Sequence, residues 1–250
     1  MRRHALRDDQ WDRIKDFLPG REGHVGGTAA DNRLFVEAVL FRYRAGIPWR
    51  DLPERFGDWK IVHQRFSRWA KSGVFERIFK LLASDPDNEY MMIDATIVRA
   101  HQHSAGARKK NGAQAIGRSR GGLTTKIHVL VDALGNPVDL MITPGQAHDL
   151  ACAEPLLDGA DPDALIGDKA YDADPLIETL TRRQITPVIP PKANRKFPRV
   201  CDFALYCERN LVERFFNKLK HFRDIATRYD KLARNFLAGI ELASAIILLN

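Results

Sequence analysis

The stretch YMMIDATIV, residues 90–98, has the composition of a buried β-strand interrupted by a single charge. Apolar residues surround Asp94 on both sides. A carboxylate in such a place is costly unless it is paired or bound to a metal ion. A structural aspartate with a satisfied partner is the commoner case, so the meaning of Asp94 depends on the rest of the chain.

Further strands follow downstream of this stretch. Residues 124–143 predict two strands joined by a turn at Gly135, and residues 164–168 predict a short apolar strand that ends in Asp168. Residues 186–191 predict a fifth strand, and helices are expected at 149–157, 174–184 and 206–224. This order favours an α/β fold, a five-stranded mixed sheet flanked by helices.

The N-terminal third has a helical pattern instead. Residues 31–46 predict a helix capped by Asp31, residues 47–57 a short second helix, and residues 58–73 a third helix capped by Asp58. One side of the third helix is basic and polar, through Lys60, Gln64, Arg68 and Lys71. This arrangement is typical of a DNA-binding helix-turn-helix, but a small bundle with a basic surface would look the same.

Composition indicates a globular protein and excludes several classes. The net charge of +7 favours a polyanionic partner, and three cysteines in no zinc spacing argue against a disulfide framework or a zinc site. The start of the chain has no secretory signal, and the apolar run 236–249 is too short for a membrane span. We expect a cytoplasmic protein with no membrane partner, divided by a linker at 84–89 into a helical domain (1–84) and an α/β domain (88–250).

Three carboxylates are candidates for one site. If the first and fourth strands are neighbours, Asp94 and Asp168 meet on the sheet, and the helix 206–224 can lay Glu213 over them. Oxygen ligands of this kind select Mg²⁺ or Mn²⁺, and two such ions can clamp an in-line phosphoryl displacement. The alternatives are that Asp172 or Asp174 takes the place of Asp168.

The helix 206–224 carries a polar stripe beside its apolar face. Tyr206, Glu213 and Lys220 are seven residues apart, and Arg209 and Asn217 fall on the same side. Glu213 could therefore simply pair with Arg209 or Lys220 along the helix.

The loop 99–123 holds six basic residues and no acidic one. Loops of this length are usually functional or disordered. We predict that it contacts DNA, the alternative being a surface insertion without a ligand.

These motifs together resemble the Asp-Asp-Glu transposases of bacterial insertion sequences, in particular the insertion-sequence-five family, whose catalytic domain is ribonuclease-H-like. The helix carries the family pattern Tyr-x2-Arg-x3-Glu-x6-Lys, filled by Tyr206, Arg209, Glu213 and Lys220. The stretches 91–110, 117–135 and 165–174 are similar to the family's catalytic domain, and 47–78 is similar to its N-terminal domain.

The resemblance implies that Asp94, Asp168 and Glu213 form the catalytic triad and bind two Mg²⁺ ions, for which Mn²⁺ substitutes. It implies metal-dependent cleavage at the terminal inverted repeats of an insertion sequence and strand transfer into target DNA. The partners would be double-stranded DNA and a second copy of the chain, as a homodimer on DNA in the bacterial nucleoid. A nuclease without strand transfer, or a DNA-binding regulator derived from a transposase, is the alternative.

The expected DNA contacts come from residues with basic or polar side chains. They are Lys60, Gln64, Arg68, Lys71, Arg108, Lys109, Lys110, Arg118, Arg120, Lys126, Arg209 and Lys220, with Tyr206 and Asn217 in supporting roles.

Overall fold

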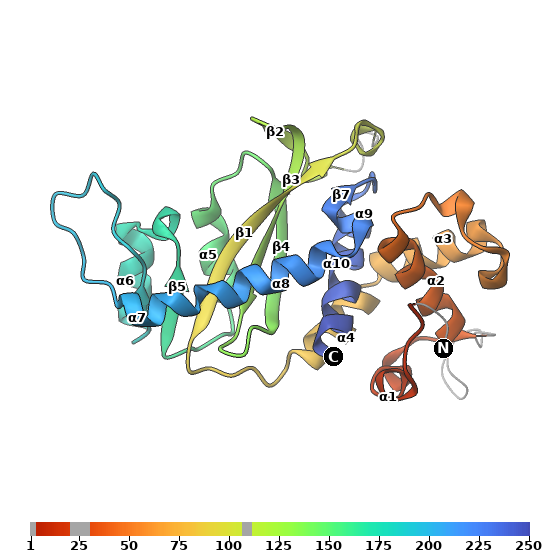
Figure 1. Ribbon diagram of the computed structural model, residues 1–250, viewed down its shortest axis with the longest axis horizontal. Helices are drawn as coiled ribbons and strands as arrows, with labels where there is room; N and C mark the ends of the chain where they lie inside the picture. Colours follow the sequence, from red (N-terminus) through yellow and green to blue (C-terminus); the bar gives the residue numbers. More distant parts are fainter. Residues whose placement is uncertain (1–3, 21–30, 107–111) are drawn as a thin grey trace. The chain divides into compact units, whose positions relative to one another are not determined.

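The computed structural model describes residues 4–20, 31–106 and 112–250, and it divides the chain into two compact units (Figure 1). The helical unit combines residues 1–82, 101–114 and 219–250, and the sheet unit combines residues 83–100 and 115–218. The break near residue 83 lies at the expected linker, but the C-terminal segment groups with the N-terminal helices rather than with the sheet. Among the described residues, no helix is long and apolar enough to cross a membrane.

The helical unit is built from helices whose ends follow from capping residues. The Asp31 side chain accepts a hydrogen bond from the Leu34 N–H at the start of α2, and Gly46 ends that helix with φ of 69°. Its α-helices are α1 (Asp8–Asp12), α2 (Asn32–Ala45), α3 (Trp59–Lys71), α4 (Val74–Leu82), α9 (Arg223–Ala226) and α10 (Ala233–Leu248). Short elements complete it: η1 (Lys15–Phe17), η4 (Gln102–Ala105) and β7 (Thr227–Arg228).

The predicted second helix at 47–57 is wrong. Two 3-10 turns replace it, η2 (Trp49–Asp51) and η3 (Glu54–Phe56), each beginning directly after a proline. Proline donates no backbone hydrogen bond and holds the preceding residue in an extended conformation, so a continuous helix cannot form here. The connection between α2 and α3 is therefore longer than the tight turn of a minimal helix-turn-helix.

The last helix completes the core of the helical unit. Phe236, Ile240 and Ala243 of α10 are buried, and the helix contacts α4, α3 and α2. Gly239 lets α10 approach α2 closely, because a Cβ atom at this position would lie 2.2 Å from the Tyr43 ring. The run 236–249 is thus a buried core helix, as predicted.

The sheet unit contains the five predicted strands. Their order is β4-β3-β1-β5-β6, with β1 antiparallel to β3, β3 antiparallel to β4, and β5 parallel to both β1 and β6. The strands are β1 (Met91–Ala100), β3 (Gly122–Val131), β4 (Pro137–Pro144), β5 (Ala164–Gly167) and β6 (Thr186–Val188). The predicted five-stranded mixed sheet is confirmed; the short strands β2 (Gly117–Ser119), which pairs with β3, and β7 were not predicted.

Helices pack on the sheet and bury its apolar side chains. Met91, Ile93 and Leu165 belong to a buried cluster with residues of α5 and α6. The helical elements of this unit are η6 (Asp149–Cys152), α5 (Ala153–Leu156), η7 (Lys169–Tyr171), α6 (Asp174–Arg182), α7 (Phe203–Tyr206), η8 (Cys207–Arg209) and α8 (Asn210–Lys220).

The predicted helix 206–224 is only partly right. The helical run starts earlier, at Phe203, where the Asp202 side chain accepts hydrogen bonds from two backbone N–H groups, and it passes through the 3-10 turn η8 before α8. It ends at Lys220, before the extended residue Phe222. Figure 1 shows α8 running across the sheet in front of β1.

Candidate active site

Strand register brings Asp94 and Asp168 together. Ile93 of β1 pairs with Gly167 of β5 in parallel register, so the next residue of each strand is one of the two aspartates. Side chains alternate between the faces of a sheet. Since Ile93 lies in the cluster with α5 and α6, Asp94 points to the opposite face. Asp168 directly follows the end of β5, and its negative charge raises the pKa of Asp94. The proximity expected from sequence therefore follows from the strand pairing.

Glu213 reaches the same region through Arg209. The Arg209 guanidinium lies 2.6 Å from Asp94 Oδ2 through Nη2 and 2.9 Å from Glu213 Oε1 through Nη1. On the helical run 203–220, Arg209 thus contacts Asp94, whereas the Glu213 side chain is 58% exposed. The alternative that Glu213 pairs with Arg209 is also realised, so the two interpretations are not exclusive.

The environment of Asp94 disfavours its charge. Burial raises the pKa of Asp94; Arg209 opposes this shift, and the negative charges of Asp168 and Asp149 add to it. The pKa of Arg209 is raised, because the attraction of Asp94 and Glu213 outweighs the lowering effect of burial. Asp94 therefore lies in a negative environment to which charges on both faces of the sheet contribute, and the Arg209 guanidinium partly balances it.

Asp172 and Asp174, the alternatives to Asp168, are engaged elsewhere. Asp172 is buried and accepts hydrogen bonds from Arg195 Nε at 2.7 Å, from Arg199, and from the Lys192 N–H at 2.8 Å. Asp174 pairs with the same two arginines. Although burial opposes it, these hydrogen bonds hold the pKa of Asp172 below its usual range. Both residues anchor the segment 192–199, whereas Asp168 uses one oxygen to accept from the Ala170 N–H at 2.8 Å.

The carboxylates suit a divalent cation in their chemistry. Their donors are all oxygen, which Mg²⁺ and Mn²⁺ prefer. Asp94 and Glu213 already bind one positive group between them, the Arg209 guanidinium. Within the described residues, no three potential ligand side chains gather closely enough to hold a metal ion. The carboxylates therefore match such a cation in donor chemistry, and ligation by three of them together would require their side chains to move closer.

A polar group behind the sheet was missed from sequence. Alternation places Lys126 and His128 of β3 on the face opposite Asp94, where Asp149 lies 2.8 Å from Lys126 Nζ and 3.7 Å from His128 Nδ1. Burial lowers the pKa of His128 to about 4. A buried histidine in an alternating strand carries no sequence signal that separates it from a surface one, so only the fold reveals this cluster.

The predicted DNA contacts fall into several places. Lys60, Gln64, Arg68 and Lys71 are exposed along one side of α3, opposite the buried Val62, Phe66 and Trp69. Arg118 and Arg120, at β2, are exposed as well.

The other predicted contacts differ in exposure. Lys126 is largely buried, and its Nζ donates to the Ala147 carbonyl at 2.8 Å. Tyr206 is partly buried at the end of α7, Asn217 is exposed on α8, and Lys220 ends that helix. Arg108, Lys109 and Lys110 lie outside the described residues.

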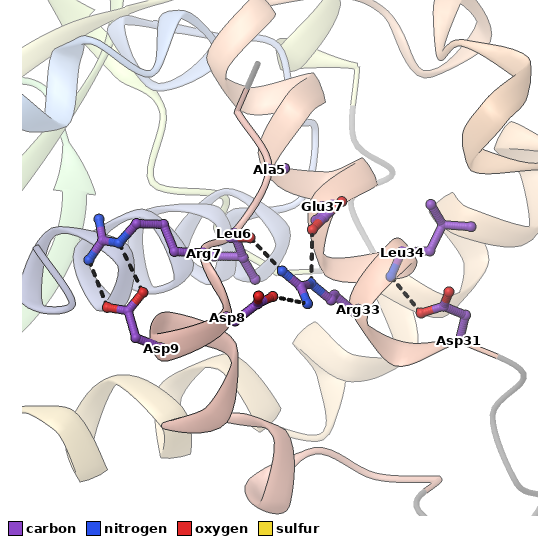
Figure 2. Close-up of a pocket in the computed structure, with 9 residues that line it drawn as sticks. All are labelled: Ala5, Leu6, Arg7, Asp8, Asp9, Asp31, Arg33, Leu34 and Glu37. Atoms are coloured by element: carbon purple, nitrogen blue, oxygen red, sulfur yellow. Dashed lines mark hydrogen bonds and ion pairs between the residues drawn. The ribbon is translucent and has the colours of Figure 1, made fainter. Parts of the chain in front are cut away.

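A separate pocket of about 660 Å³ lies in the helical unit (Figure 2). Its charges satisfy one another: Arg33 contacts Asp8 at 2.7 Å, Glu37 at 3.2 Å and the Leu6 carbonyl at 2.6 Å. None of the three candidate carboxylates lines it. We therefore place the chemistry at the sheet and not in this pocket.

Comparison with known families matches nearly the whole chain. A family model described as "Putative transposase of IS4/5 family" matches residues 6–79, and two models described as "Transposase DDE domain" match residues 86–200 and 165–250. The chain is 40% identical over 127 residues to a putative transposase for insertion sequence element IS6501 of Brucella ovis, covering 50% of this chain and 98% of that protein. It is 50% identical over 110 residues to the uncharacterized protein y4sN of Sinorhizobium fredii, covering 44% of this chain and 88% of that protein.

Solved structures with a partial likeness are also transposases. The piggyBac transposase in a synaptic complex with hairpin DNA aligns with a TM-score of 0.44 and 13% identity, over 75% of this chain and 48% of that one. The Mos1 transposase in a paired-end complex aligns with a TM-score of 0.27 and 14% identity, over 74% of this chain and 66% of that one.

Proposed function

Because the chain belongs to the DDE transposases of the IS4/5 insertion-sequence family, we propose that it binds the terminal inverted repeats of an insertion sequence and catalyses metal-dependent DNA cleavage and strand transfer. One observation carries the assignment of the site. Asp94 and Asp168 follow paired residues of adjacent parallel strands, and Glu213 of α8 is linked to Asp94 through Arg209. All three side chains are oxygen donors, which Mg²⁺ and Mn²⁺ prefer.

The proposed roles follow from position. Asp94 and Asp168 would hold Mg²⁺ from the sheet, and Glu213 would complete the ligands from the helix; Mn²⁺ would substitute. When bound, two such ions activate the attacking oxygen and neutralise charge at the scissile phosphate. Arg209, Lys220 and Tyr206, on the same helical run, would position the DNA strand beside the carboxylates. The chain itself supplies orientation and forms no covalent bond to DNA.

DNA binding is proposed to rest on the exposed basic side of α3 and on the arginines near β2. Pairing of two transposon ends implies a homodimer on DNA, acting in the bacterial cytoplasm at the nucleoid. Substituting Lys60 and Arg68 with glutamine should weaken binding to terminal-repeat DNA and reduce the slope of log K against log salt by about 1 for each lost phosphate contact. Fluorescence anisotropy at several salt concentrations measures this. Lys15→Gln, an exposed lysine paired with Asp12, is the matched control and should leave the slope unchanged.

The catalytic proposal is tested with labelled DNA that carries the element's own terminal repeats. Wild type should nick this DNA at the repeat end and join it to target DNA in Mg²⁺ or Mn²⁺. Asp94→Asn, Asp168→Asn and Glu213→Gln should each lose both products while still binding DNA. Cleavage without joined product would instead support a nuclease, and binding without cleavage in wild type would support a regulator.

A further inference from the structure

The Arg209 guanidinium occupies the space between two of the proposed catalytic carboxylates. Its two terminal nitrogens serve different partners, Nη2 binding Asp94 at 2.6 Å and Nη1 binding Glu213 at 2.9 Å. Among the described residues, Arg209 Nε is buried and has no hydrogen-bond partner. The guanidinium is therefore held by the two carboxylates, and its Nε–H donates to none of the described groups.

The contacts of Arg209 are those of a cation between anions. The Asp94 side chain is only 14% exposed, so its charge needs compensation from a partner. Arg209 supplies it with a planar fork whose geometry suits carboxylates. The Glu213 side chain is 58% exposed, and on the described residues only Arg209 is seen to hold it toward Asp94.

Arg209 uses one oxygen of each carboxylate, Asp94 Oδ2 and Glu213 Oε1, and fills the space between them. A divalent cation chelated between Asp94 and Glu213 would need this space, and its charge would repel the guanidinium, so each disfavours binding of the other. We propose that Arg209 is a placeholder: it bridges Asp94 and Glu213 in the chain without DNA or metal, and it leaves the carboxylates when a divalent cation binds.

This role goes beyond the proposed function and rests on it, since the cation is the one that strand cleavage would use. Arg209 would keep the carboxylates paired until substrate arrives and would then be free to contact a DNA phosphate. Because the guanidinium competes with the cation for Asp94 and Glu213, Arg209 should lower the metal affinity of the free chain. A residue that only binds phosphate would have no such effect.

Mn²⁺ binding to the DNA-free chain tests the placeholder directly. The electron paramagnetic resonance signal of free Mn²⁺, recorded at low ionic strength, measures this binding. Arg209→Gln should bind Mn²⁺ about fivefold to tenfold more tightly than wild type, because a competing ion pair is removed from a partly exposed site. Arg214→Gln is the matched control, an exposed arginine of the same helix next to Glu213, and should change affinity less than about twofold. The double variant Arg209→Gln, Glu213→Gln should lose this increase in Mn²⁺ affinity.

A second readout guards against a folding defect. Mn²⁺ should raise the unfolding midpoint of Arg209→Gln more than that of wild type, because tighter binding to the folded chain stabilises it more. Asp94-dependent Mn²⁺ binding that is no tighter in Arg209→Gln than in Arg214→Gln would overturn the placeholder and leave the proposed function standing. If wild type binds no Mn²⁺, or if Asp94→Asn binds Mn²⁺ as tightly as wild type, the metal site itself is wrong. Both proposals would then fail.

Discussion

Asp94 and Asp172 show two ways in which this chain keeps a carboxylate away from water. Two arginines and a backbone N–H neutralise Asp172, whose pKa is lowered. Asp94 has one guanidinium, and burial raises its pKa. A carboxylate whose charge is balanced by several partners usually has a structural role. A carboxylate with fewer partners, next to a second aspartate, is typical of a functional site. Among the described residues, Asp168 accepts one backbone hydrogen bond, whereas Asp172 and Asp174 both pair with Arg195 and Arg199.

Substitution of Asp168 and Asp172 should therefore have opposite effects. Asp172→Asn leaves Arg195 and Arg199 without their buried partner and should cost about 2 kcal/mol of unfolding free energy. Asp168→Asn keeps the oxygen that accepts from Ala170 and should change stability by less than about 0.5 kcal/mol, yet abolish DNA cleavage. Urea denaturation and the cleavage assay on the same preparations measure both. If Asp172→Asn folds normally but cannot cleave, the second carboxylate is Asp172.

His128 should make stability depend on pH. Burial lowers its pKa to about 4, so between roughly pH 6.5 and 4 the unfolded chain takes up a proton that the folded chain does not. Stability contributed by neutral His128 is present above pH 6.5 and is lost as pH falls through this window. Lowering pH from 7 to 5 should cost wild type about 2 kcal/mol more than His128→Gln. The exposed His221→Gln should follow wild type, and parallel profiles for wild type and His128→Gln would refute the role of burial.

Among the elements, local chemistry made most of the sheet unit predictable. Continuous apolar runs marked β1, β3 and β5, and Asp31, Gly46 and Asp58 marked helix ends. The two prolines of 47–57 interrupt the helical pattern, so two 3-10 turns occur where the apolar spacing predicted a helix. The approach of Asp168 to Asp94 was predictable from strand order, whereas the Arg209 bridge depends on side-chain reach that spacing does not determine.

The packing of α10 was not predictable, because an apolar helix does not reveal which partner it covers. Gly239 tests the observed packing. Helix propensity alone predicts that Gly239→Ala stabilises α10 by about 1 kcal/mol. The contact with Tyr43 predicts the reverse, a loss of about 1–3 kcal/mol through overpacking. Thermal unfolding decides between them, with Gly121→Ala as a control whose Cβ meets nothing closer than 3.9 Å.

On the scale of the whole molecule, the chain passes between the two units four times, near residues 83, 101, 115 and 219. The helical unit is therefore incomplete without the C-terminal segment. A fragment of residues 1–84 lacks α10 and the partners of Arg42, whose buried guanidinium contacts Asp224 and Asp230. An unpaired buried charge of this kind costs about 3–5 kcal/mol.

The fragment 1–84 should consequently fail to fold alone, and adding residues 219–250 through a linker should restore it. Circular dichroism and thermal melting of the two fragments measure this. A cooperative melt of 1–84 alone, close to that of the full chain, would show that the N-terminal helices form an independent domain.

The central claim, that Asp94 holds the cation used for DNA cleavage, is tested most directly by exchanging its ligand atom. Asp94→Cys presents sulfur, which Mg²⁺ binds poorly and Mn²⁺ tolerates better. In single-turnover cleavage of terminal-repeat DNA, we predict a loss of at least about 100-fold in Mg²⁺ and a recovery of about tenfold or more in Mn²⁺. Wild type and Asp172→Cys should show no such difference between the metals. If Asp94→Cys cleaves at the wild-type rate in Mg²⁺, Asp94 does not hold the cation and the assigned site is wrong.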